Sequence, residues 1–146
     1  MFKIIGTSLF CFLLFSCKIG SQVTKKQEIK IHDIELSRDY LIPENNSPYE
    51  ISNTYLNENI LSIVVNYSGG CKDHEWALKG STSYLKSLPP KKGIFLEHNS
   101  NEDVCRTFIT DTLKFNIEKL KYPGKESDYT VIIQLGNYKQ NIPYKY

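Results

Sequence analysis

The chain has 146 residues, of which 40% are hydrophobic and 12% aromatic, and its formal net charge is only +2. So small a charge creates no field that would hold nucleic acid or anionic lipid, which excludes binding through a strongly basic surface. Ten tyrosines against a single methionine favour β-structure over a helical bundle. A chain of this length is expected to form one domain with its own hydrophobic core.

The first 16 residues have the features of a signal peptide. Lys3 supplies a positive charge, and the apolar run from Ile4 to Phe15 is too short to span a bilayer as a helix. The run ends in Leu14-Phe15-Ser16-Cys17, which resembles the lipobox of bacterial lipoproteins. The resemblance implies cleavage before Cys17 and attachment of lipid to its thiol and amino group, an anchor that several acyl chains make stable. The alternative is an ordinary secretory signal in which Cys17 is incidental.

Residues 17–28 are predicted to form a lipidated tether that lifts the domain off the membrane. The stretch from Lys18 to Gln27 is polar, lacks hydrophobic periodicity and contains no acidic residue. In lipoproteins of the Bacteroidota, acidic residues soon after the lipidated cysteine are associated with export to the cell surface. Their absence here favours the periplasmic face of the outer membrane over the cell surface.

Alternating apolar residues predict short β-strands along residues 29–146. The strongest is Ile60 to Tyr67, which is apolar on both faces and is therefore expected at the centre of a sheet. Residues 39–53 carry two prolines and an Asn-Asn pair, so we expect mostly loop there, with room for one short edge strand. The other predicted strands are Glu28 to Leu36, His74 to Lys79 with Trp76 facing inward, Gly93 to His98, Cys105 to Ile117 with a bulge or bend near Asp111, Tyr129 to Leu135, and Gln140 to Tyr146 at an edge.

About seven short strands without helical periodicity predict an all-β fold, namely an antiparallel sandwich. Trp76 follows a long hydrophobic strand, which resembles the arrangement in immunoglobulin-like domains, where a tryptophan of the next strand covers the core. We therefore expect residues 29–146 to form an immunoglobulin-like β-sandwich.

Two clusters hold most of the residues that are capable of chemistry. One surrounds Cys71, and the other runs from His98 to Cys105. Of the four cysteines, Cys11 leaves with the signal peptide and Cys17 carries the lipid, which leaves Cys71 and Cys105. Outside the cytoplasm two remaining thiols usually pair, so we expect a disulfide between them.

The same clusters contain the ligands of a metal site, which is the first alternative. Cys71 and His74 have the Cys-x-x-His spacing of half a zinc site, and two thiolates with two imidazoles suit tetrahedral Zn²⁺. His98 and Cys105 would complete the set, at a looser spacing of six intervening residues. Copper is also a candidate in the cell envelope, but no methionine lies nearby to supply a thioether.

A cysteine nucleophile is the second alternative, with His74 or His98 as the base and the Gly69-Gly70 backbone as oxyanion donor. No known catalytic signature surrounds Cys71, however. P-loop, dinucleotide-binding, HExxH and GxSxG motifs are all missing from the chain. The sequence therefore predicts that the protein is not an enzyme.

The motif Tyr67-x-Gly69-Gly70-Cys71-x-x-His74, followed by His98-Asn99-x-x-x-Asp103-x-Cys105, is similar to a pattern shared by small, uncharacterised lipoproteins of the Bacteroidota. The resemblance covers about residues 60–135. It implies a location in the cell envelope and a shared architecture, with no activity to carry over. Asp111-Thr112-Leu113 also fits the O-glycosylation motif of that phylum, although a structural strand threonine is the simpler interpretation.

These observations predict a lipid-anchored protein of the cell envelope whose disulfide-stapled sandwich binds or scaffolds another envelope component. The alternative function is a metal-binding lipoprotein that uses Cys71, His74, His98 and Cys105 for zinc or copper. The predicted partners are the membrane, through the lipid, and another envelope protein, whereas nucleic acid is not expected.

Overall fold

The computed structural model describes residues 30–39, 46–125 and 127–146. The predicted signal peptide, the predicted tether and the lipidation site at Cys17 lie outside these residues. Within the described ranges, no helix is both long enough and apolar enough to cross a membrane.

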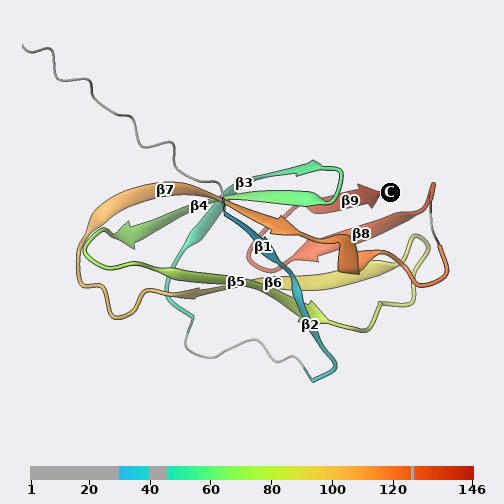
Figure 1. Cartoon of the computed structure of the whole chain (residues 1–146), viewed down its shortest axis with the longest axis horizontal. Helices are drawn as coiled ribbons and strands as arrows, with labels where there is room; N and C mark the ends of the chain where they lie inside the picture. Colours follow the sequence, from blue (N-terminus) through green and yellow to red (C-terminus); the bar gives the residue numbers. More distant parts are fainter. Residues whose placement is uncertain (1–29, 40–45, 126) are drawn as a thin grey trace, which may run out of the picture.

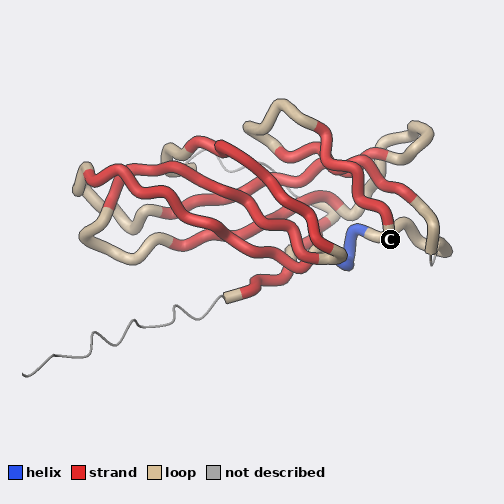
Figure 2. The backbone as a smooth tube through the Cα atoms, turned by 90° about the horizontal axis from the view of Figure 1, so that it is seen from above, coloured by secondary structure: helices blue, strands red, loops and turns tan. Residues whose placement is uncertain are grey.

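Two β-sheets pack against each other (Figures 1 and 2), which confirms the prediction of an all-β sandwich. One sheet has the strand order β1-β7-β4-β3, and the other has the order β2-β5-β6-β8-β9. The strands are β1 (Ile31–Asp33), β2 (Glu35–Ser37), β3 (Glu50–Asn57), β4 (Ile60–Gly69), β5 (Glu75–Ser81), β6 (Lys91–Asn99), β7 (Thr107–Asn116), β8 (Thr130–Leu135) and β9 (Asn141–Lys145), with a 3-10 turn η1 (Glu118–Leu120) after β7.

The hydrophobic core lies between the sheets and is built from alternate residues of each strand. β4 contributes Leu61, Ile63 and Val65, none of which exposes any surface, from a central place in its sheet. The facing sheet contributes Leu78 of β5 and Leu96 of β6 to the same cluster. The central position and the inward face predicted for residues 60–67 are therefore confirmed.

Three strand pairs are parallel, which corrects the expectation of a purely antiparallel sandwich. β1 pairs with β7, β2 with β5, and β6 with β8 in parallel. β1 and β2 are the two halves of the predicted first strand, and they separate at the fully buried Ile34. Each half joins a different sheet. The sequence did not predict this, because alternation of apolar residues identifies the buried side of a strand but not its neighbours.

The parallel pair of β6 and β8 follows from the path of the chain. β7 lies in the other sheet and returns the chain to the end of the sandwich where β6 began, so β8 starts beside the start of β6. The strand order of this sheet therefore differs from that of the antiparallel sheets of immunoglobulin domains.

Two local predictions need adjustment. The edge strand for which residues 39–53 left room is the beginning of β3, which is longer than expected, extends over Glu50–Asn57 and forms a hairpin with β4 around Glu58, at φ 52°. No bulge interrupts β7 near Asp111, since β7 and β4 stay in register from Gly69 opposite Thr107 to Ile60 opposite Asn116. The register shift lies in β3 instead, between Ile51 and Asn53.

Candidate functional site

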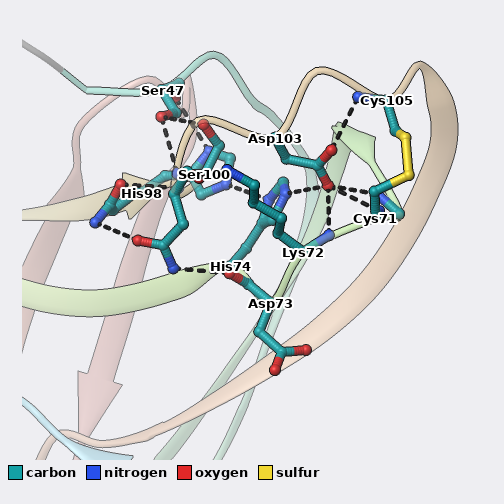
Figure 3. A network of polar contacts seen from close by, with 12 residues as sticks. Ser47, Cys71, Lys72, Asp73, His74, His98, Ser100, Asp103 and Cys105 are labelled. Carbon is teal, nitrogen blue, oxygen red and sulfur yellow. Dashed lines mark hydrogen bonds and ion pairs between the residues drawn. A yellow bond between two sulfur atoms is a disulfide. The ribbon is translucent and has the colours of Figure 1, made fainter.

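Two loops meet at one end of the sandwich, namely residues 70–74 between β4 and β5 and residues 100–106 between β6 and β7 (Figure 3). We call these two loops, together with His98 near the end of β6, the clasp. A disulfide joins Cys71 of the first loop to Cys105 of the second, with Cα atoms 5.9 Å apart. The predicted pairing of the cysteines is therefore confirmed. Because 34 residues separate them, the chain-entropy model assigns the cross-link about 4 kcal/mol of stabilisation.

The carboxylate of Asp103 connects the two loops a second time. Its Oδ2 accepts hydrogen bonds from the backbone N–H groups of Gly70, Cys71 and Lys72 at 2.9, 2.9 and 3.0 Å. Its Oδ1 accepts one from the backbone N–H of Cys105 at 2.9 Å. The side chain is fully buried. These donors, with Cys105 as the largest contributor, hold the pKa of the Asp103 carboxyl far below its usual range.

Glycines create the space in which Asp103 binds. Gly70 has a φ of +113°, a conformation that side chains rarely adopt, and it turns successive N–H groups toward one point. A Cβ on Gly69 would lie 2.6 Å from Cε1 and Nε2 of His74, so only a glycine lets that ring approach the strand. The Gly-Gly pair is therefore needed for the anion site and for the histidine beside it.

His74 and His98 form a contact of their own inside the clasp. Nδ1 of His74 lies 2.8 Å from Nε2 of His98, and Nε2 of His74 lies 3.3 Å from Oδ2 of Asp103. On the far side, Nδ1 of His98 lies 3.2 Å from the carbonyl oxygen of Ser47. The side chain of His74 and the whole of His98 are each 3% exposed, and burial lowers the pKa of His98.

Aromatic rings enclose the two histidines. The indole of Trp76 stacks on the His98 ring at 3.8 Å between centroids and 3° between planes. Tyr67 packs against His74 at 4.8 Å, and Tyr49 meets His98 edge-on at 5.9 Å. The inward orientation predicted for Trp76 is confirmed, since Trp76 packs against the hydrophobic core together with Tyr67 and Tyr49.

Residues 46–49 hold His98 in place, a role that the sequence did not reveal. β8 pairs with β6 only as far as Ile94. On that side of β6, the backbone N–H and carbonyl groups after Ile94 therefore need other partners. Asn46 Oδ1 accepts from the N–H of His98 at 2.6 Å, and the N–H of Ser47 donates to the carbonyl of His98 at 2.9 Å. The hydroxyl of Tyr49 donates to the carbonyl of Leu96.

The four predicted metal ligands do not converge on a common centre. The sulfurs of Cys71 and Cys105 are bonded to each other and so are not thiolates, the form in which cysteine binds zinc. The rings of His74 and His98 direct one nitrogen each at the other. This geometry favours the disulfide over both the metal site and the cysteine nucleophile.

The second clasp loop has a strained but well-supported backbone. Asn101 and Glu102 have φ values of 51° and 56°, which non-glycine residues seldom adopt. The Asn101 side chain donates to the backbone carbonyl of Asp73 at 2.8 Å, and the backbone carbonyl of Asn101 accepts from Lys72 Nζ at 2.7 Å. The first loop therefore holds the shape of the second.

Two large apolar side chains nevertheless face solvent here. Val104, next to Cys105 in the second loop, is 87% exposed, and Phe108, near the start of β7, is 72% exposed. Thr112, farther along β7, is exposed as well, and its glycosylation stays a prediction.

No protein-family model matches the chain, and no curated protein matches it. Solved structures share its fold. A NigD-like immunity protein from Bacteroides caccae is 15% identical, with a TM-score of 0.55 over 77% of this chain and 58% of that one. A putative toxin-related protein from Parabacteroides distasonis is 19% identical, with a TM-score of 0.50 over 80% and 61%.

A protein of unknown function from Bacteroides vulgatus is 12% identical, with a TM-score of 0.52 over 81% of this chain and 56% of that one. The chain thus spans about three fifths of the length of these proteins. At such identities the likeness establishes the all-β fold alone.

Proposed function

We propose that this protein is a lipid-anchored binding protein of the cell envelope, and that its clasp end recognises another envelope protein. The observation that supports this proposal is a contrast within residues 100–106. Their backbone is tied down by a disulfide, a buried carboxylate and side-chain hydrogen bonds, yet Val104 is 87% exposed.

Such a loop suits recognition for a physical reason. Ordering a flexible loop on binding costs free energy, and a loop that is already ordered avoids that cost. An exposed apolar side chain on a rigid loop gains free energy when a partner removes it from water.

The proposed anchor rests on the sequence. Leu14-Phe15-Ser16-Cys17 resembles a lipobox, and the polar residues 18–27 would allow the sandwich to reach a partner near the membrane. The lack of acidic residues in that stretch supports the periplasmic face of the outer membrane. The proposed partner is a protein, because Val104 of the clasp and Phe108 near the start of β7 expose apolar side chains and the chain carries little net charge.

The fold supports one class of partner in particular. A protein described as a NigD-like immunity protein shares the sandwich. A protein toxin is therefore the first partner to test against the purified chain.

Two variants test the anchor and the binding surface separately. Cys17→Ala should move the protein from the membrane fraction to the soluble fraction and abolish labelling with palmitate. For the surface, the double variant Val104→Ser with Phe108→Ser should capture less partner from detergent-solubilised envelope than the unchanged protein does.

Leu88→Ser is the matched control for the surface, because Leu88 is 92% exposed in the β5–β6 loop at the opposite end of the sandwich. Capture that falls equally in Leu88→Ser, or that survives the double substitution, would refute recognition by the clasp. Membrane association that survives Cys17→Ala would refute the lipid anchor.

A further inference from the structure

Four ring nitrogens lie in a row between two oxygen atoms inside the clasp. The row starts at the carbonyl oxygen of Ser47, passes through His98 and His74, and ends at Oδ2 of Asp103. Its three contacts measure 3.2, 2.8 and 3.3 Å. Each of them needs one hydrogen between its two heavy atoms to be a hydrogen bond.

Both ends of this row are acceptors. A carbonyl oxygen has no hydrogen to donate, and neither has an ionised carboxylate. Oδ2 of Asp103 already accepts from three backbone N–H groups, and the low pKa of its carboxyl, due first to the Cys105 N–H, keeps it ionised. All three hydrogens must therefore come from the two imidazole rings.

Two neutral imidazoles carry only two N–H groups between them. With both rings neutral, one of the three contacts would bring two acceptors face to face. The side chains of His74 and Asp103 are 3% and 0% exposed, and His98 is 3% exposed, so water does not relieve that repulsion. Three N–H groups satisfy every contact.

We propose that His74 and His98 share three protons, so that the clasp contains one buried imidazolium paired with Asp103, and that a fourth proton breaks the pair. The imidazolium is His74, because it lies between two acceptors, the Nε2 of His98 and the carboxylate of Asp103. His98 is then neutral, with its hydrogen on Nδ1 toward Ser47. The clasp thereby becomes an acid-sensitive element of the fold.

The neighbouring groups leave Asp103 as the counter-charge. Burial raises the pKa of Tyr67 and of Tyr49, with Asp111 adding to the effect on Tyr67, so both phenols stay neutral beside the rings. The Lys72 ammonium donates to the carbonyl of Asn101.

The remaining charged side chains of the two loops point to solvent, namely those of Asp73, Glu102 and Arg106. Among the described residues, none of these three side chains forms a hydrogen bond or an ion pair with either imidazole ring. The charge balance of the row therefore depends on the two histidines and Asp103.

Acid breaks the row at its centre. A proton added to Nε2 of His98 would place two N–H groups against each other across 2.8 Å and would bury a second positive charge. The lowered pKa of His98, caused first by burial, agrees with this. Because the unfolded chain takes up that proton more readily, the stability of the clasp falls as the pH drops below about 6.5.

Nitrogen-15 NMR of the imidazole rings tests the proton count directly. His32 is the third of three histidines and lies in β1, so His32→Gln leaves only the two rings in question. Near neutral pH we expect one ring with both nitrogens protonated and one ring with Nδ1 alone protonated. Two neutral rings, or two doubly protonated rings, would overturn the proposal.

Acid titration of Trp76 fluorescence tests the fourth proton. Trp76 is the single tryptophan of the chain and stacks on His98, so protonation of that ring should change its emission. The transition should occur in the unchanged protein and in His32→Gln, and should disappear in His98→Gln. A transition that persists in His98→Gln, or that is lost in His32→Gln, would contradict the assignment.

Discussion

A single carboxylate, that of Asp103, joins the two loops of the clasp through hydrogen bonds. Asp103 receives four backbone hydrogen bonds and contacts His74, although it is two residues from Cys105 and could have been a surface acid. The sequence shows Asp103 only as one residue of the His98-Asn99-x-x-x-Asp103-x-Cys105 pattern. It does not reveal the role of the carboxylate, because its partners are mostly backbone N–H groups, which every residue except proline has. Its role becomes visible only when the two loops are known to meet.

Asp103→Asn should lower the melting temperature, because an amide cannot replace a carboxylate that accepts on both oxygens. Glu102→Gln, the neighbouring exposed acid, is the control and should change it little. The folded-state pKa of Asp103 is depressed, so its contribution is present above the unfolded pKa and is lost as pH falls through the folded one. The difference between the unchanged protein and Asp103→Asn should therefore shrink below about pH 4. A difference that is constant down to strong acid would count against the role.

Lys92 is the second buried charge, and it lies far along β6 from the clasp. It is 1% exposed, donates to the carbonyl of Thr82 at 2.8 Å and lies 3.9 Å from the centre of the Tyr84 ring. Burial lowers its pKa to about 8 from 10.5. Because the folded value lies below the unfolded one, stability should rise as pH increases from about 8 to about 10.5, by at most about 3 kcal/mol.

Chemical denaturation at several pH values checks this expectation. Lys92→Met keeps the apolar stem and removes the titrating group, so its stability should lack the alkaline rise. An equal rise in both proteins would show that another group causes it.

At the scale of elements, the sequence predicted most strands well. β4, β5, β6, β8 and β9 follow their apolar alternation, and β9 lies at an edge as expected. The full length of β3 was not predicted, because this strand lies at the edge of its sheet and is rich in polar residues such as Ser52, Asn53 and Asn57. The phase of the strands also predicted that Trp76 faces inward, whereas the neighbours of each strand depend on the whole fold.

Gly69 of β4 lies close to the His74 ring of the following loop, and a substitution at Gly69 tests how much this contact contributes to stability. Gly69→Ala would put a Cβ 2.6 Å from the His74 ring, which should displace the ring from Asp103 and cost about 1–3 kcal/mol. Gly93→Ala in β6 is the matched control, since a Cβ there meets nothing within 4 Å. Denaturant unfolding of both variants checks the prediction, and equal losses would contradict it.

The disulfide can be tested in the same way. The double variant Cys71→Ala with Cys105→Ala should lose about 4 kcal/mol of stability, as should the unchanged protein after treatment with a dithiol. Thiol titration of protein prepared without reductant should find both cysteines blocked. Two free thiols together with one equivalent of zinc would instead support the metal site.

At the scale of the whole molecule, the sandwich holds its clasp at one end and the β5–β6 loop at the other (Figure 1). The fold class could be predicted from alternation and composition. The parallel pairs could not, because they depend on which sheet each strand joins. The proposed binding surface could not be predicted from the sequence, since the rigid backbone of residues 100–106 and the exposure of Val104 are properties of the folded chain.

Site-specific photo-crosslinking in intact cells tests the central claim most directly. A photoreactive amino acid would replace Val104 at the clasp or Leu88 at the opposite end, two side chains that are 87% and 92% exposed. We expect a discrete protein adduct from position 104 and none from position 88. Adducts from position 88 alone, equal adducts from both positions, or none from either would contradict recognition through the clasp.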